Sequence, residues 1–94
     1  MQIRPALIVS TPVGPGGSIF WSMMITSAER SAWPGDISLR ERHLECGLPR
    51  PCVIRTEKIA TLEAVRVLNV LGPLPADLWT SVRLALARYL HFSE

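Results

Sequence analysis

Hydrophobic residues in this chain gather in short runs that proline and glycine interrupt, a pattern typical of a protein built mainly from β-strands. Residues 5–10 form one compact apolar run and residues 18–25 form a second. The Pro- and Gly-rich stretch 11–17 between them predicts a loop, so the two runs predict a hairpin with a long tip. Residues 36–39 alternate apolar and polar positions, which indicates a half-exposed strand.

The middle of the chain predicts further strands joined by polar turns. Residues 26–35 are turn-rich, and residues 40–46 are dense in charge and predict a solvated turn or a short helix. The runs 52–56 and 58–62 are strand-like, and they predict either two strands or one continuous bent strand. Residues 65–71 predict another strand, which a Gly-Pro pair ends.

One helix is predicted, over residues 75–90. Pro75 suits the first helical turn, where its missing N–H costs nothing, and Asp77 complements the helix dipole there. Apolar residues recur at helical spacing and form one face: Leu78, Val82, Ala85, Leu86 and Tyr89. Short strands followed by one terminal helix predict a mainly β fold, a small and partly open barrel with the helix packed on it.

Length, net charge and arginine content limit the number of domains and the kinds of ligand that we expect for this chain. A chain of 94 residues predicts a single domain over 1–94, with a core modest enough that dimerisation would help it. The net charge of +2 is too small to argue by itself for duplex DNA binding. Nine of the ten basic residues are arginine, whose planar fork binds phosphate in two-point fashion.

The cysteines and the apolar runs exclude several other classes. Cys46 and Cys52 lack the four-ligand spacing of a zinc site, and no metal or other cofactor is expected. No secretory signal is recognisable, so a disulfide between them is not expected either. No apolar run approaches the roughly 20 residues that span a bilayer. We expect a cytoplasmic protein.

A series of short motifs gives a sharper indication. In chain order they are Arg4-Pro5-Ala6-Leu7-Ile8-Val9-Ser10, Met24-Ile25-Thr26-Ser27-Ala28, Trp33-Pro34-Gly35-Asp36, Gly47-Leu48-Pro49, Cys52-Val53-Ile54-Arg55 and Lys58-Ile59-Ala60-Thr61. In this order and spacing the chain resembles the MazF/PemK family, the ribonuclease toxins of bacterial toxin–antitoxin pairs. The resemblance implies an SH3-like barrel, a homodimer inhibited by a cognate antitoxin, and cleavage of single-stranded RNA without a metal. The products would be a 2′,3′-cyclic phosphate and a 5′-hydroxyl.

The same resemblance implies the site residues. Arg4, in the Arg-Pro motif, would clamp the phosphate and protonate the leaving group, and Thr26 matches the catalytic threonine. Ser27 falls where some members have a serine that touches the phosphate. Arg55 and Glu57 are two apart, so on a strand they should project together as a charged pair. In the PemK branch of the family an arginine and an aspartate at these positions serve as acid or base, and Glu57 is a longer replacement for that aspartate. Each residue also has a structural alternative. Arg4 could be an ordinary surface arginine, Thr26 and Ser27 could cap a turn, and Arg55 and Glu57 could form a solvent-facing salt bridge. For Glu57 the catalytic and the structural interpretation are equally favoured.

Other residues that could carry chemistry are assigned to the surface or the core. His43 lies in a charged turn and His91 at the end of the predicted helix, and neither matches a family site. Trp33 could stack on a base, but a rigid Trp-Pro-Gly turn is preferred. Trp21 and Trp79 are candidates for the core or an interface.

Family members usually carry one more strand and loop before the Arg-Pro-Ala motif, so the resemblance implies a barrel without its usual first strand and with an exposed edge. A misassigned start or a decayed remnant is favoured over a genuine short form, and full activity is not expected. Two functional alternatives stay open. One is a CcdB-like toxin that binds gyrase without cutting, and the other is an inactive remnant that only binds antitoxin.

Overall fold

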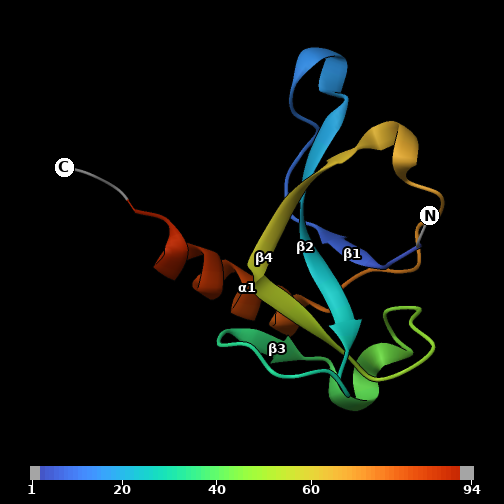
Figure 1. Ribbon diagram of the computed structural model, residues 1–94, viewed down its shortest axis with the longest axis vertical. Coiled ribbons are helices and arrows are strands. Elements are labelled where there is room, and N and C mark those ends of the chain that lie inside the picture. Colours follow the sequence, from blue (N-terminus) through green and yellow to red (C-terminus); the bar gives the residue numbers. More distant parts are fainter. Residues whose placement is uncertain (1–2, 92–94) are drawn as a thin grey trace.

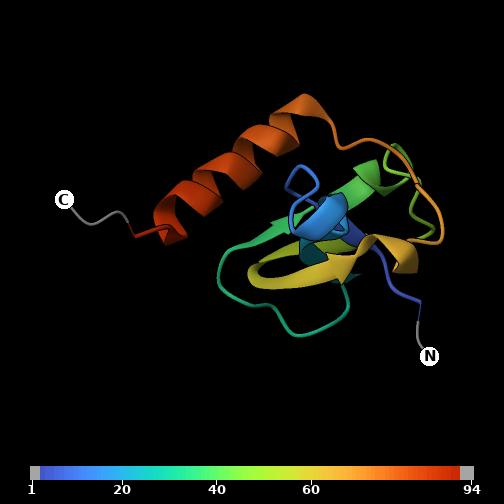
Figure 2. The same cartoon turned by 90° about the horizontal axis from the view of Figure 1, so that it is seen from above.

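The computed structural model describes residues 3–91, which form one antiparallel sheet and a C-terminal helix. The sheet has four strands in the order β1-β2-β4-β3, with β1 and β3 at its two edges. Helix α1 (Ala76–Tyr89) lies along one side of the sheet (Figures 1 and 2). The mainly β prediction with one terminal helix is therefore confirmed, and within the described residues the sheet stays open rather than closing into a barrel.

The strands follow the predicted apolar runs. β1 spans Ala6–Ile8, β2 Ile19–Ser27, β3 Asp36–Ser38 and β4 Cys52–Glu63. β1 and β2 form the predicted hairpin, whose long tip contains a short 3-10 turn, Pro15–Gly17. The alternative of one continuous bent strand is the one adopted by β4, which is the longest strand and pairs with both β2 and β3.

The bend in β4 is marked by a break in its pairing with β2. Met24 lies opposite Arg55, but the preceding residue, Met23, lies opposite Ile59. Residues 56–58 are therefore an insertion on one strand only, which bends that strand and interrupts the alternation of its side chains.

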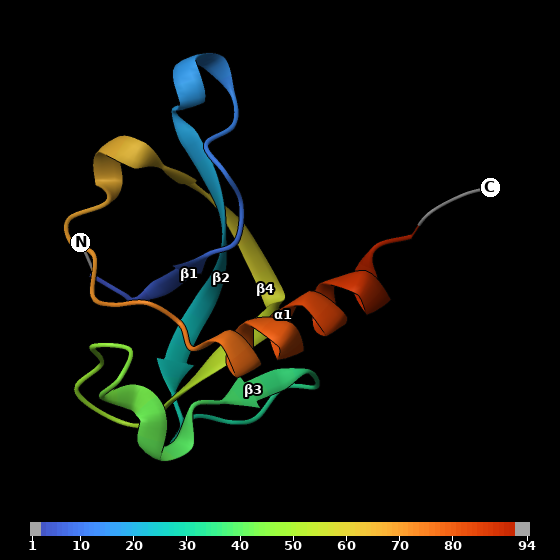
Figure 3. The same ribbon diagram turned by 180° about the vertical axis from the view of Figure 1, so that it is seen from behind.

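The prediction of a strand over residues 65–71 is wrong. A short 3-10 turn covers Ala64–Arg66, and the chain then runs without regular structure to α1 (Figure 3). Val65 and Val70 are 86% and 82% exposed. Their β-branched side chains favour extended backbone, but no strand within residues 3–91 lies beside them to supply hydrogen bonds.

The core lies between the sheet and α1. The helix begins one residue after Pro75, which occupies the capping position, and it ends at Tyr89. It buries Val82 and Ala85, and Trp79 packs beside them, whereas Trp21 is 53% exposed on the sheet. The other fully or nearly buried apolar residues are Met23, Leu39, Cys46, Leu48, Cys52 and Ile54.

Residues 40–46 include the predicted short helix, a 3-10 helix over Arg40–His43. Arg42 in this helix pairs with Asp77 in the first turn of α1 and with Glu45. The side chain of Asp77 is 67% exposed, so the pair links two elements at the surface without burying charge.

Candidate cationic cleft

A cleft of about 460 Å³ opens at the C-terminal end of β2, beside the segment that leads into β1 and the first half of β4. It brings together four of the five predicted site residues, Arg4, Thr26, Ser27 and Arg55. Its remaining walls are Ile3, Pro5, Met24, Ile25, Arg30, Leu48, Pro49, Arg50, Cys52 and Lys58. Residues from five separate stretches of the chain thus meet in one depression.

Strand pairing explains why these residues meet. The Ile25 N–H donates to the Pro5 carbonyl, which holds the segment after Arg4 against β2. Arg55 lies directly opposite Met24, and directly opposed residues on paired strands project to the same face. Thr26 is two positions along β2 from Met24, so it shares that face. The register of β1, β2 and β4 therefore sets the site.

The cleft is strongly cationic. Three cations that we did not predict, Arg30, Arg50 and Lys58, line it together with Arg4 and Arg55, and no described carboxylate does. Arg30 and Arg50 lie in turns next to the strand ends, where sequence periodicity carries no signal for a shared site. Crowding of like charges lowers the free energy of any anion that enters.

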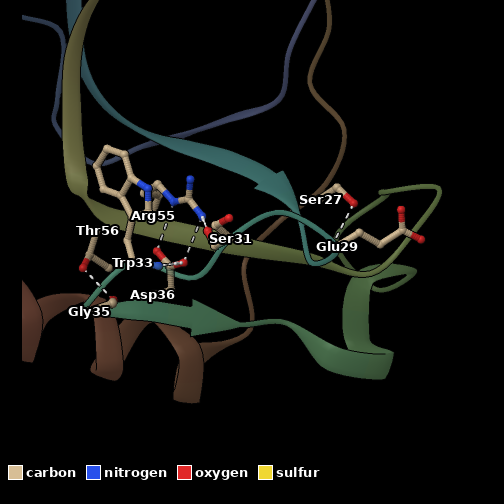
Figure 4. Close-up of polar contacts among 8 residues, drawn as sticks. All are labelled: Ser27, Glu29, Ser31, Trp33, Gly35, Asp36, Arg55 and Thr56. Carbon is tan, nitrogen blue, oxygen red and sulfur yellow. Dashed lines mark hydrogen bonds and ion pairs between the residues drawn. The ribbon is translucent and has the colours of Figure 1, made fainter.

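Arg55 is the most constrained of these cations. Its side chain is 9% exposed and pairs with Asp36, which is 10% exposed. Nε donates to Asp36 Oδ1 at 3.3 Å, and Nη2 donates to Asp36 Oδ2 at 3.1 Å and to the Ser31 carbonyl at 2.8 Å (Figure 4). The guanidinium carbon also lies 4.7 Å from the centre of the Trp33 ring, within cation–π range.

Trp33 to Asp36 form the predicted rigid turn. The Asp36 N–H donates to the Trp33 carbonyl, and the Trp33 N–H donates to Asp36 Oδ2. Gly35 supplies the positive φ of 80° that the turn requires. The buried Thr56 hydroxyl donates to the Gly35 carbonyl at 2.7 Å, which fixes the turn against the bend in β4.

The predicted pairing of Arg55 with Glu57 is wrong. The carboxylate partner of Arg55 is Asp36, and Glu57 is exposed and does not line the cleft. The cause is the insertion at residues 56–58, because two-residue spacing keeps side chains on one face only while the strand is regular.

Ser27 also has a structural contact. Its Oγ accepts a hydrogen bond from the Glu29 N–H at 3.3 Å, which is the turn-capping alternative (Figure 4). The hydroxyl hydrogen is still available to donate into the cleft, so capping and ligand contact are compatible at Ser27.

The histidines, His43 and His91, and Cys46 do not line the cleft, whereas Cys52 forms part of its wall. Cys46 and Cys52 are buried free thiols, and burial raises the pKa of both. In the described part of the chain, no three His, Cys, Asp or Glu side chains are grouped to hold a metal ion. No helix there is long and apolar enough to cross a membrane.

Comparison with known proteins places the chain beside bacterial toxins. A family model described as PemK-like, MazF-like toxin of type II toxin-antitoxin system matches residues 1–90. The Mycobacterium tuberculosis toxin MazF-mt6 superimposes with a TM-score of 0.73 at 21% identity, covering 90% of this chain and 83% of that one. An Mtb toxin structure superimposes with a TM-score of 0.74 at 20% identity, covering 93% and 92%. A search of curated proteins found no match.

Proposed function

This chain belongs to the PemK-like, MazF-like toxins of type II toxin–antitoxin systems, and we propose that it is an endoribonuclease that cuts single-stranded RNA without a metal. Cleavage of cellular RNA would block translation and growth. In the proposed reaction the ribose 2′-oxygen attacks the adjacent phosphorus and the bond from phosphorus to the 5′-oxygen breaks. The 2′-hydroxyl gives its proton to a base and the departing 5′-oxygen receives one from an acid, which leaves a 2′,3′-cyclic phosphate and a 5′-hydroxyl.

The observation that carries this proposal is the composition of the cleft. Five cations and two hydroxyls converge in it, and none of the described acidic side chains lines it. A phosphodiester needs such donors, because negative charge grows on its phosphoryl oxygens as the 2′-oxygen attacks. The volume of about 460 Å³ lies within the range of small-molecule sites, so a phosphate and its neighbouring sugar can enter together.

The position of each residue in the cleft suggests its role in the proposed reaction. Arg55, buried and fixed, binds the phosphoryl oxygens, and Thr26 and Ser27 donate neutral hydrogen bonds to the same group. Arg4 precedes β1, which lies on the other side of β2 from β4, and it clamps the phosphate from there and is the candidate acid for the 5′-oxygen. Glu57 is the candidate base, and its side chain does not line the cleft.

The proposed working form is a cytoplasmic homodimer that a cognate antitoxin inhibits. A flexible acidic segment of the antitoxin would compete with RNA for the cationic cleft, since both are polyanions. Exposed apolar side chains support burial of a second surface by a partner subunit: Val65, Leu68, Val70, Leu84 and Leu90.

The test is incubation of the purified chain with a defined single-stranded RNA in EDTA, followed by analysis of the fragment ends. Cyclic-phosphate and 5′-hydroxyl ends that disappear in Arg4→Ala and Thr26→Ala, and persist in the exposed-helix control Arg83→Ala, would support the proposal. Glu57→Gln should retain most of the activity if the base lies elsewhere. Intact RNA together with gyrase inhibition would favour the CcdB-like alternative, and intact RNA with antitoxin binding alone would favour a remnant.

A further inference from the structure

The Arg55 guanidinium is hydrogen-bonded through Nε and Nη2 but not through Nη1. A guanidinium has five N–H donors, one on Nε and two on each terminal nitrogen. The three on Nε and Nη2 are all used, on the two Asp36 carboxylate oxygens and the Ser31 carbonyl. The two on Nη1 have no partner among residues 3–91. Figure 4 shows one terminal nitrogen of Arg55 pointing away from Asp36 and Ser31.

The open nitrogen is accessible rather than buried. No buried side-chain nitrogen or oxygen in the described chain lacks a hydrogen-bond partner, so an unbonded Nη1 must reach solvent. Arg55 is otherwise buried, and the space that it borders is the cationic cleft. Because Arg55 lines the cleft and its Nε and Nη2 donors are already bonded, the two Nη1 donors are the ones left to bind a phosphate there.

We propose that Asp36 is a positioning residue that presents Nη1 of Arg55 to the scissile phosphate. The two-point contact with Asp36 fixes the plane of the guanidinium, and the Trp33 ring covers one of its faces. Trp33 thus helps to hold the arginine in place. Donors fixed in advance lower the barrier because they need no reorganisation when charge develops. This inference rests on the proposed function for the identity of the ligand.

A purely structural role for Asp36 is the competing explanation, since removing one partner of a buried ion pair destabilises a protein in any case. The two explanations differ in what they change. Loss of positioning lowers kcat at unchanged fold, whereas loss of stability lowers the folded fraction and leaves the activity of folded molecules intact.

The first experiment compares Asp36→Asn with Asp77→Asn. Both remove one negative charge from an arginine–aspartate pair, but the pair of Asp77 with Arg42 is exposed and does not line the cleft. We expect Asp36→Asn to lower kcat by roughly 10- to 100-fold with a smaller change in KM, and Asp77→Asn to match the wild type. Wild-type kcat in a folded Asp36→Asn variant would overturn the proposal.

A second measurement needs no variant at Asp36. In protein labelled with ¹⁵N-arginine, the resonances of Arg55 are identified by their loss in Arg55→Lys. An RNA oligonucleotide made uncleavable by a 2′-deoxy substitution is then added. We expect the Nη1 resonance to shift and those of Nε and Nη2 to stay. Equal shifts at both terminal nitrogens would show that Asp36 does not fix the group, and would overturn the proposal even if Asp36→Asn fails to fold.

The two proposals can fail separately. If wild-type protein cuts no RNA but the oligonucleotide shifts Nη1 alone, the ribonuclease assignment fails, and the presentation of Nη1 by Asp36 to a bound phosphate stands. If RNA is cut and folded Asp36→Asn cuts it equally fast, the ribonuclease assignment stands and the positioning fails.

Discussion

The hydroxyls of Thr56 and Tyr89 lie 2.7 Å apart and share a hydrogen bond that joins the bend of β4 to the last turn of α1. Thr56 also donates to the Gly35 carbonyl, so it cannot donate to both at once, and Tyr89 is the donor of the shared bond. A chain of contacts thus runs from the helix end, through the bend, to the turn that carries Asp36.

The substitution Tyr89→Phe removes the hydroxyl that bonds to Thr56, the first contact in this series. We expect it to lower the free energy of unfolding by about 1 kcal/mol, because Thr56 keeps its bond to Gly35 and only one hydrogen bond is lost. Urea denaturation measures the change. Arg83→Ala on the exposed side of α1 is the control and should stay near the wild-type value. No loss in Tyr89→Phe would show that the contact contributes nothing.

Gly35 and Gly16 form a matched pair for testing the turn. Both have positive φ, 80° and 64°, but a Cβ at Gly35 would collide with the Tyr89 and Thr56 hydroxyls, whereas one at Gly16 would meet nothing within 4 Å. Gly16→Ala should cost about 1 kcal/mol of stability from backbone strain. Gly35→Ala should cost clearly more and should also reduce RNA cleavage. Equal losses in thermal unfolding would contradict the close approach.

The salt dependence of RNA binding tests the cationic cleft. Each phosphate contact made by a cation should contribute about 0.7 to the slope of log affinity against log salt for a single strand. Lys58→Ala and Arg50→Ala should each reduce the slope by that amount, while Arg83→Ala should leave it unchanged. Filter binding at several salt concentrations measures the slopes, and identical slopes in all variants would place RNA elsewhere.

The two buried thiols predict a pH effect on stability. Burial raises the pKa of Cys46 and Cys52 above the usual 9.0, so the unfolded chain loses these protons first as the pH rises. The unfolded state then binds fewer protons than the folded state, and stability falls above about pH 9. The Cys46→Ala/Cys52→Ala protein should lose less stability between pH 8 and pH 10 than the wild type in urea titrations. A parallel decline in both would contradict this.

Sequence patterns located most of the fold and part of the cleft. Apolar runs predicted β2 and β4, and helical spacing placed α1 to within one residue at each end, because burial of one face imposes a period that the sequence must carry. The stretch 65–71 shows the limit of this reasoning. Its composition suits a strand, but a strand also needs a neighbour, which only the tertiary structure decides.

The partner of Arg55 could not be found in the same way. Asp36 is separated from it by 19 residues and reaches it because β3 pairs with β4 with Asp36 directly opposite Arg55. Two-residue spacing pointed to Glu57 instead, since nothing in the sequence reveals the three-residue insertion that turns Glu57 away. Motif order located Arg4, Thr26, Ser27 and Arg55, whereas the strand register had to supply Asp36.

The two arginines on opposite sides of the cleft, Arg4 and Arg55, are held in place by different numbers of contacts. Arg4 precedes a strand of three residues that pairs on one side only, whereas Arg55 is bound by a carboxylate, a carbonyl and an aromatic ring on a strand paired on both sides. A displacement of the N-terminal segment would therefore move Arg4 away from Arg55 while Arg55 stays in place. Because β1 meets β2 over three residue pairs and has no strand on its other side, a shift of β1 would change the width of the cleft.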